Sequence, residues 1–237
     1  MRSITLDIQI YFEIKKYINK NELKTGDRLP SERELSEIFN VQRLTVREAL
    51  KRLKNEGIVY SIRGSGNYIA EEKIQRNLSK FESLTNTIKK IGFNIKTKVI
   101  YIKEIESNKK LSNIMDVTLG TKVYEVKRLR FVKDIPLALE TSYIPVRYAQ
   151  GLNNCDLENK SLYETLENQY NIKLSSANQE IFMVFADKEE SKLLGIGEGD
   201  ALLMLKGTVL DSEGKKIEYS KSLTRGDRCV FTSELTR

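Results

Sequence analysis

Apolar positions between the N-terminus and Gly57 recur at the spacing of α-helices, and the pattern predicts three of them. Apolar side chains at positions 10, 14, 17 and 18 share one face of a first helix. Ser31, with Glu34 three residues later, forms a capping box that predicts the start of a second helix. A third helix carries an apolar stripe at positions 46, 49, 50 and 53, and Gly57 suits its C-terminal cap.

Two strand-like runs follow at residues 58–62 and 67–70, and they flank the tip Arg63-Gly64-Ser65-Gly66. Glycines permit the unusual backbone angles that a tight tip requires. The segment 1–70 is therefore predicted to contain three helices and a hairpin, which we expect to form one domain.

The pattern changes beyond a polar segment at residues 71–77, where we place a linker. An amphipathic helix at 78–91 ends at Gly92, and apolar and polar residues then mark a series of strands, at 96–105, 122–132, 136–144, 179–186, 201–210, 216–223 and 228–234. Further helices are expected at 107–116, 161–170 and 187–195. Consecutive strands joined by short hairpins favour an α+β domain with an antiparallel sheet over residues 78–237.

Composition narrows the function classes. The chain has no histidine, which removes histidine-based metal sites and histidine acid–base catalysis. Cys155 and Cys229 lie far apart without metal-ligand spacing, so neither a zinc site nor a disulfide framework is expected. The start of the chain has no signal-peptide pattern and no apolar run is long enough to span a membrane, so we expect a cytoplasmic protein without metal or cofactor. The net charge of +7 makes a polyanionic partner plausible.

Polar residues on the third helix and the hairpin tip are candidates for contact with double-stranded DNA. The apolar stripe faces the core, which turns arginine side chains outward, and arginine binds guanine or phosphate well. A charged residue early in the second helix could hold the DNA backbone, and glycines at the tip allow close approach to the duplex. The alternative is an ordinary solvated helix face. The candidate DNA contacts are Arg33, Arg43, Thr45, Arg47, Arg63, Gly64 and Gly66.

A pair of arginines suggests an anion site in the second domain. Within the strand expected at 122–132, alternate side chains share a face, so Arg128 and Arg130 lie about 7 Å apart on the same side. Together they could hold a phosphate, sulfate or carboxylate. The alternative is a solvent-exposed face of the sheet. Glu140 could accept hydrogen bonds from ligand hydroxyls, or it could be a surface carboxylate.

Several segments at the expected spacings resemble the winged helix-turn-helix of the GntR family of regulators: Pro30-Ser31-Glu32-Arg33, Arg43-Leu44-Thr45-Val46-Arg47, Leu53-Lys54-Asn55-Glu56-Gly57 and Arg63-Gly64-Ser65-Gly66. The resemblance covers nearly all of residues 8–70. It implies that Arg33, Arg43, Thr45, Arg47 and Gly66 contact DNA. The family more often has serine where this chain has Gln42, so a contact or a helix cap differs there.

The second domain resembles the UTRA effector-binding domain of the HutC subfamily over about residues 78–236, which implies a chorismate-lyase-like fold. The matching segments are Lys127-Arg128-Leu129-Arg130, Ile135-Pro136-Leu137-Ala138-Leu139-Glu140-Thr141-Ser142-Tyr143-Ile144-Pro145, Ser161-Leu162-Tyr163, Tyr219-Ser220-Lys221-Ser222 and Arg225-Gly226-Asp227-Arg228. By resemblance to members that sense sugar phosphates, the anionic group would lie among Ser83, Thr85, Arg128, Arg130 and Ser161. Glu140 and Glu218 would contact sugar hydroxyls.

Structural alternatives exist for some of these positions. Ser161 with Glu164 also forms a capping box and could be purely structural. Two residues depart from the pattern, since Ser176 stands where arginine is frequent and Thr224 where several phosphosugar sensors have tyrosine. The anion site could therefore be kept while the rest of the pocket recognises another group.

These observations predict a ligand-responsive transcription regulator, most simply a homodimeric repressor that a small anionic effector, such as a phosphorylated sugar, releases from its operator. One alternative is a DNA-binding dimer whose C-terminal domain is only structural. Another is an enzyme, because the chorismate-lyase-like fold that the resemblance implies is an enzyme fold. The sequence, however, offers no set of residues that could form a catalytic site.

Overall fold

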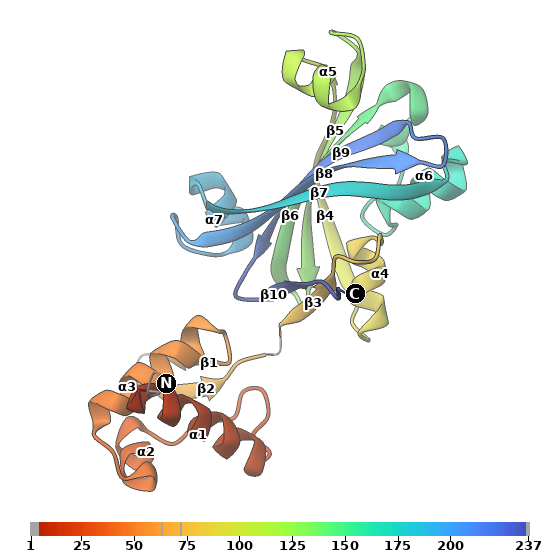
Figure 1. Ribbon diagram of the computed structural model, residues 1–237. Coiled ribbons are helices and arrows are strands. Elements are labelled where there is room, and N and C mark those ends of the chain that lie inside the picture. The colour runs from red at the N-terminus through yellow and green to blue at the C-terminus, as the bar shows by residue number, and fades with distance from the viewer. Residues whose placement is uncertain (1–4, 63, 72, 236–237) are drawn as a thin grey trace. The chain divides into compact units, whose positions relative to one another are not determined.

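The computed structural model describes residues 5–62, 64–71 and 73–235. The chain divides into two compact units, Met1–Ile74 and Gln75–Arg237, which are drawn in Figure 1. Each unit has its own apolar core, as expected for independent domains. No helix within the described residues is long and apolar enough to cross a membrane.

The first unit contains three helices and a hairpin, as the sequence predicts: α1 (Leu6–Lys20), α2 (Glu32–Phe39), α3 (Arg43–Asn55), β1 (Val59–Ile62) and β2 (Gly66–Ile69). Its core joins the apolar faces of all three helices, including Ile14, Leu35 and Leu50, none of which is exposed. The predicted capping box forms, because Ser31 Oγ accepts from the Glu34 amide while Glu34 Oε2 accepts from the Ser31 amide. This cap fixes where α2 begins, and α2 leads into α3.

The second unit is built on a six-stranded antiparallel sheet in the order β4-β5-β6-β9-β8-β7 (Figure 1). Its strands are β4 (Ile95–Glu106), β5 (Lys122–Val132), β6 (Ile135–Pro145), β7 (Leu174–Phe185), β8 (Ala201–Asp211) and β9 (Lys216–Arg225). A separate two-stranded sheet pairs β3 (Ile74–Asn77) with β10 (Cys229–Thr232). The predicted α+β class with an antiparallel sheet is confirmed.

Helices cover both faces of the large sheet. The helices of this unit are α4 (Leu84–Lys90), α5 (Lys109–Met115), α6 (Leu162–Tyr170) and α7 (Lys188–Leu194), with short 3-10 turns at Val146–Tyr148 and Leu152–Asn154. Leu166 of α6 packs in a cluster with Val126, whereas Leu194 of α7 packs with Leu129. Because residues 126 and 129 point to opposite faces of β5, α6 covers one face and α7 covers the other.

The structure differs from the sequence expectations between residues 71 and 92. Part of the segment expected as a linker is strand β3, because it pairs with β10 near the C-terminal end of the chain. The next helix starts at Leu84 rather than at residue 78, since the Leu78 amide continues the pairing by donating to the Thr232 carbonyl. Ser83 then caps α4, its Oγ accepting from the Asn86 amide.

Candidate functional site

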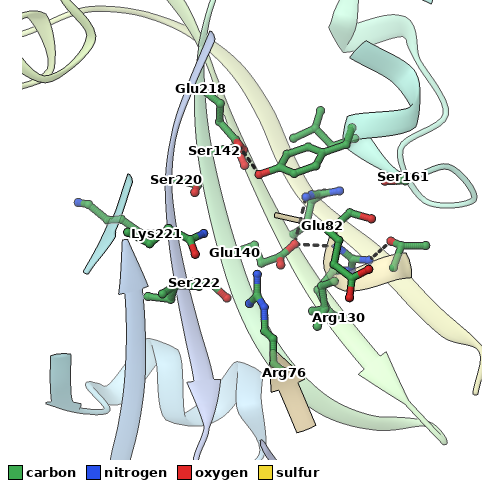
Figure 2. A pocket seen from close by; sticks show the side chains of 18 residues that line it. Arg76, Glu82, Arg130, Glu140, Ser142, Ser161, Glu218, Ser220, Lys221 and Ser222 are labelled. Carbon is green, nitrogen blue, oxygen red and sulfur yellow. Dashed lines mark hydrogen bonds and ion pairs between the residues drawn. The ribbon is translucent and has the colours of Figure 1, made fainter. Parts of the chain in front are cut away.

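A polar pocket opens on the face of the large sheet that α6 covers, within the second unit (Figure 2). Its floor comes from neighbouring strands in register, with Arg128 on β5 opposite Glu140 on β6, and Glu140 opposite Ser222 on β9. Its rim comes from the starts of α4 and α6 and from β3. All seven residues expected at an effector site line this one pocket: Ser83, Thr85, Arg128, Arg130, Glu140, Ser161 and Glu218.

The two arginines of β5 are buried rather than displayed on a solvent-exposed face. Arg128 is 5% exposed and Arg130 is 3% exposed. Arg128 Nη2 donates to Glu140 Oε2 over 3.0 Å, and Arg130 Nη1 donates to the same oxygen over 2.7 Å. Arg130 Nη2 also donates to Thr85 Oγ1 over 2.7 Å, which ties the start of α4 to the sheet.

The pocket holds buried donors that the protein leaves without acceptors. Over the described residues, four buried side-chain nitrogen or oxygen atoms lack a hydrogen-bond partner: Arg76 Nη1, Arg128 Nε, Arg128 Nη1 and Arg130 Nε. All four belong to arginines that line this pocket. A buried donor without an acceptor costs about 1–3 kcal/mol, and more when it is charged. An anion in the pocket would remove that cost.

Glu140 is a carboxylate that offsets only part of this positive charge. Burial alone would raise its pKa, but the charges of Arg130, Arg128 and Arg76 outweigh burial and lower the pKa to about 2. Glu140 is therefore ionised at neutral pH. Glu82 also lines the pocket (Figure 2), but it is paired with Lys90. Glu140 beside three guanidinium groups therefore leaves this end of the pocket positively charged, which suits an anionic ligand.

The other end of the pocket carries hydroxyls and a second carboxyl group. Glu218 is 2% exposed and accepts a hydrogen bond of 3.0 Å from the Tyr163 hydroxyl. Burial raises the pKa of Glu218, although hydrogen bonds from Ser142 and Tyr163 oppose the shift. Ser220 and Ser222 add hydroxyls on β9 (Figure 2). This end can both donate to and accept from a polyhydroxyl group.

The Ser161 side chain does not take the helix-capping role that the sequence also allowed. Ser161 occupies the N-cap position of α6, but its side chain makes no capping hydrogen bond, so the capping box with Glu164 does not form. Ser161 is nevertheless 4% exposed and lines the pocket. By contrast, Ser83 does cap α4, and its hydroxyl hydrogen remains available to donate.

The two departures from the family pattern lie outside the pocket lining. Among the described residues that form the lining, neither Ser176 nor Thr224 occurs. Ser176 is exposed on β7, and Thr224 is buried beside Ser222, with 3.3 Å between their hydroxyl oxygens. Thr224 therefore lies directly behind the lining residue Ser222.

Two notable residues of the pocket were not predicted from the sequence. Arg76 lies in the segment expected as a linker, where nothing local indicates that the chain pairs with a strand near its C-terminal end. Tyr163 was part of a matching segment, but its hydroxyl is brought to Glu218 only by the packing of α6 on the sheet. The signal for Tyr163 was its place directly after Ser161 and Leu162 at the start of a predicted helix.

The candidate DNA contacts lie on the surface of the first unit. Arg43 is the first residue of α3 and is exposed, and Thr45, in the same first turn, is partly exposed. Arg47 Nη2 lies 3.0 Å from Glu32 Oε2, and Arg33 Nε lies 3.0 Å from Glu37 Oε1. These exposed pairs are weak and can be exchanged for phosphate contacts.

The hairpin tip has the backbone geometry that its glycines suggest. Gly64 and Gly66 have φ angles of +77° and +135°, which residues other than glycine rarely adopt. A Cβ at Gly66 would also lie 3.0 Å from Arg28 Nε, so the Arg28 guanidinium lies against the tip. Arg63 lies outside the described residues. Gln42 precedes α3 without a side-chain capping bond, as its departure from serine suggests.

Comparison with known proteins identifies a matching family for each of the two units. Residues 6–69 match the bacterial regulatory proteins of the gntR family, and residues 90–229 match the UTRA domain. The chain is 34% identical to the HTH-type transcriptional repressor NagR of Bacillus subtilis (strain 168) over 234 residues, 99% of this chain and 96% of that protein. It is 31% identical to the mannosyl-D-glycerate transport/metabolism system repressor MngR of Escherichia coli (strain K12), covering 94% of this chain and 93% of that protein.

A solved structure supports the same assignment. The crystal structure of PhnF from Mycobacterium smegmatis superposes with a TM-score of 0.70 and 27% sequence identity, covering 96% of this chain and 99% of that one. The relatives are named as transcriptional regulators and repressors rather than enzymes, which confirms the expectation of a regulator.

Proposed function

This chain belongs to the GntR family of bacterial regulatory proteins and carries a UTRA domain, and from that premise we propose that it is a homodimeric repressor released from its operator by a phosphorylated sugar. The observation that carries the effector class is the set of four orphaned guanidinium nitrogens in one pocket. The proposal that the protein binds DNA rests on the family assignment.

A sugar phosphate matches both ends of the pocket. The phosphate would accept from the free nitrogens of Arg128 and Arg130 and from the hydroxyls of Ser83, Thr85 and Ser161. The sugar hydroxyls would contact Glu140 and Glu218, whose carboxyl groups both line the pocket. The relative named for mannosyl-D-glycerate transport and metabolism supports a sugar-related ligand.

The first unit would bind the operator through α3 and the hairpin tip. Arg43, Thr45 and Arg47 would meet base edges and phosphates in the major groove, with Arg33 on the DNA backbone. Gly64 and Gly66 would bring the hairpin backbone close to the duplex, beside Arg63. Two copies would contact two half-sites of a pseudo-palindromic operator, about one helical turn apart or a multiple of it.

Effector binding would release DNA by a shift in population. The effector can do so only if it binds the DNA-free state more tightly than the DNA-bound state. It would then favour dimers in which the two half-site contacts no longer match the operator spacing. This coupling is reciprocal, so operator DNA must weaken effector binding by the same factor.

Thermal unfolding against a panel of small molecules tests the effector class. The panel contains sugar phosphates, the matching free sugars, amino-acid derivatives and phosphonates, and the readout uses a dye because the chain has no tryptophan. A ligand at about 100 times its Kd should stabilise the protein by roughly 2.7 kcal/mol. We expect stabilisation by phosphorylated sugars and none by the matching free sugars or the amino-acid derivatives.

Two arginine variants sharpen the result. Arg128→Ala should lose the stabilisation, whereas Arg147→Ala, a change to an arginine held on the protein surface against Tyr148, should keep it. Stabilisation by a neutral compound and by no phosphate ester would refute the sugar-phosphate proposal. If no small molecule changes either stability or DNA affinity, the C-terminal domain serves dimerisation alone.

A further inference from the structure

Arg76 occupies a position that links the pocket to the start of the second unit. It lies on β3, directly after the boundary between the units at Ile74 and Gln75. It also lines the pocket with Arg128 and Arg130, and Figure 2 shows its side chain extending toward Glu140. The same side chain therefore belongs both to the ligand pocket and to the strand that follows the DNA-binding unit in the chain.

The guanidinium of Arg76 is only partly satisfied. Its Nη1 atom is buried and has no hydrogen-bond partner among the described residues. Its charge helps to lower the pKa of Glu140, after burial and the stronger effects of Arg130 and Arg128. The guanidinium carbon lies 5.7 Å from the centre of the Phe231 ring on β10. An anion in the pocket would supply the acceptor that Arg76 lacks.

Strand β3 has few other constraints. It is four residues long and pairs with one short strand, β10, in a sheet of two strands. Two-stranded sheets are marginally stable by themselves, so side-chain contacts decide how firmly β3 is held. A new charged hydrogen bond through Arg76 would restrict the strand more than the same bond would restrict a central strand of the large sheet.

We propose that Arg76 is a third anion-binding arginine of the pocket and that, through it, ligand occupancy fixes β3 and so constrains the chain leading back to the DNA-binding unit. The inference rests on the proposed function, because it assumes an anionic effector. It adds to that proposal the element that responds to the ligand, strand β3. Arg128 and Arg130 lie on a strand paired on both sides, so they hold the anion without moving, whereas Arg76 transmits its presence.

Hydrogen exchange of the full-length chain, with inorganic phosphate as the probe, tests this role. Potassium chloride at equal ionic strength is the reference, which removes general screening from the comparison. In the wild type, phosphate should slow exchange at the amides of residues 74–78. In Arg76→Gln, the phosphate concentration for half-maximal thermal stabilisation should rise about 10- to 100-fold, as expected for loss of a charged hydrogen bond.

The decisive measurement is made with each variant saturated by phosphate. In Arg76→Gln, peptides from β5 and β6 should still be protected while residues 74–78 exchange as they do without phosphate. Arg76→Lys keeps the charge without the guanidinium fork and should give an intermediate result. Arg147→Gln, outside the pocket, should behave as the wild type.

The outcomes separate this inference from the proposed function. If phosphate and the sugar phosphates fail to stabilise the wild type, the anionic effector fails and this inference fails with it. If the wild type responds and Arg76→Gln matches it in phosphate affinity and in protection of residues 74–78, the role of Arg76 alone is overturned.

Discussion

Replacing Glu140 by glutamine should destabilise the unliganded protein substantially, because Glu140 is the carboxylate shared by two buried arginines. The size of this destabilisation follows from the lowered pKa of Glu140. A carboxyl group whose pKa falls from 4.5 to about 2 on folding contributes roughly 3 kcal/mol at neutral pH, since each tenfold change in acidity corresponds to about 1.4 kcal/mol. Removing one partner of a buried ion pair typically costs about 3–5 kcal/mol, which agrees.

The dependence on pH identifies the cause. The pKa of Glu140 is lower in the folded state, so its contribution is fully present above about pH 4.5 and is lost as the pH falls through 2. The difference between wild type and Glu140→Gln should therefore shrink from about 3 kcal/mol at pH 7 to about 2 kcal/mol at pH 3.5. Urea unfolding of both proteins at each pH, monitored by circular dichroism, measures that difference.

A surface carboxylate supplies the matched control. Glu180 is 67% exposed in its side chain and pairs with Lys206 across β7 and β8. Glu180→Gln should change the free energy of unfolding by no more than about 0.5 kcal/mol. An equal effect of both substitutions, or a Glu140→Gln difference that stays constant with pH, would refute the assignment of Glu140 as the ionised partner of the arginines.

Three other substitutions test separate parts of the molecule. Arg47→Ala should weaken operator binding by about 1–3 kcal/mol in a fluorescence anisotropy titration, and unchanged affinity would remove it from the DNA contacts. Ser161→Ala should weaken binding of a sugar phosphate about 3- to 10-fold yet change stability by less than about 0.5 kcal/mol, because its hydroxyl does not cap α6. Gly207→Ala should destabilise the second unit by several kcal/mol in thermal unfolding, because a Cβ there would lie 2.1 Å from the Asn178 carbonyl oxygen. Gly226→Ala, where the nearest atom is 3.7 Å away, should change stability little, and similar losses in both would contradict the steric argument.

Structural elements that depend on residues close together in the chain could be predicted from the sequence. The capping box at Ser31 fixed the start of α2, and alternation along β5 placed Arg128 and Arg130 on one face. The match to a known family supplied Ser83, Thr85, Ser161 and Glu218, which now line one pocket with Glu140 and the arginines. Without that match, the residues indicate the arginine pair and leave Glu140 as either a ligand acceptor or a surface carboxylate.

Elements set by pairing over long distances could not be predicted. Strand β3 is polar in three of its four residues, and it exists because β10 lies beside it. The helix expected from residue 78 begins at Leu84 for the same reason, since the Leu78 amide is engaged by Thr232. Arg76 was missed with the strand that carries it. Helix periodicity cannot reveal a strand whose partner lies near the other end of the chain.

The two ends of the pocket are built on elements of different rigidity, and this division favours signalling through the anion. Glu140 and Glu218 lie on β6 and β9, central strands that are paired on both sides. The anion end also takes side chains from α4, α6 and β3, which are not strands of the large sheet. A hydrogen bond between Thr85 and Arg130 ties α4 to the sheet, whereas β3 pairs with β10 in a separate sheet. A ligand hydroxyl therefore meets acceptors on central strands, whereas an anion bound to Arg128 and Arg130 would also engage Arg76 on β3. A sugar without its anionic group would give Arg76 no acceptor, so it should not slow hydrogen exchange in β3.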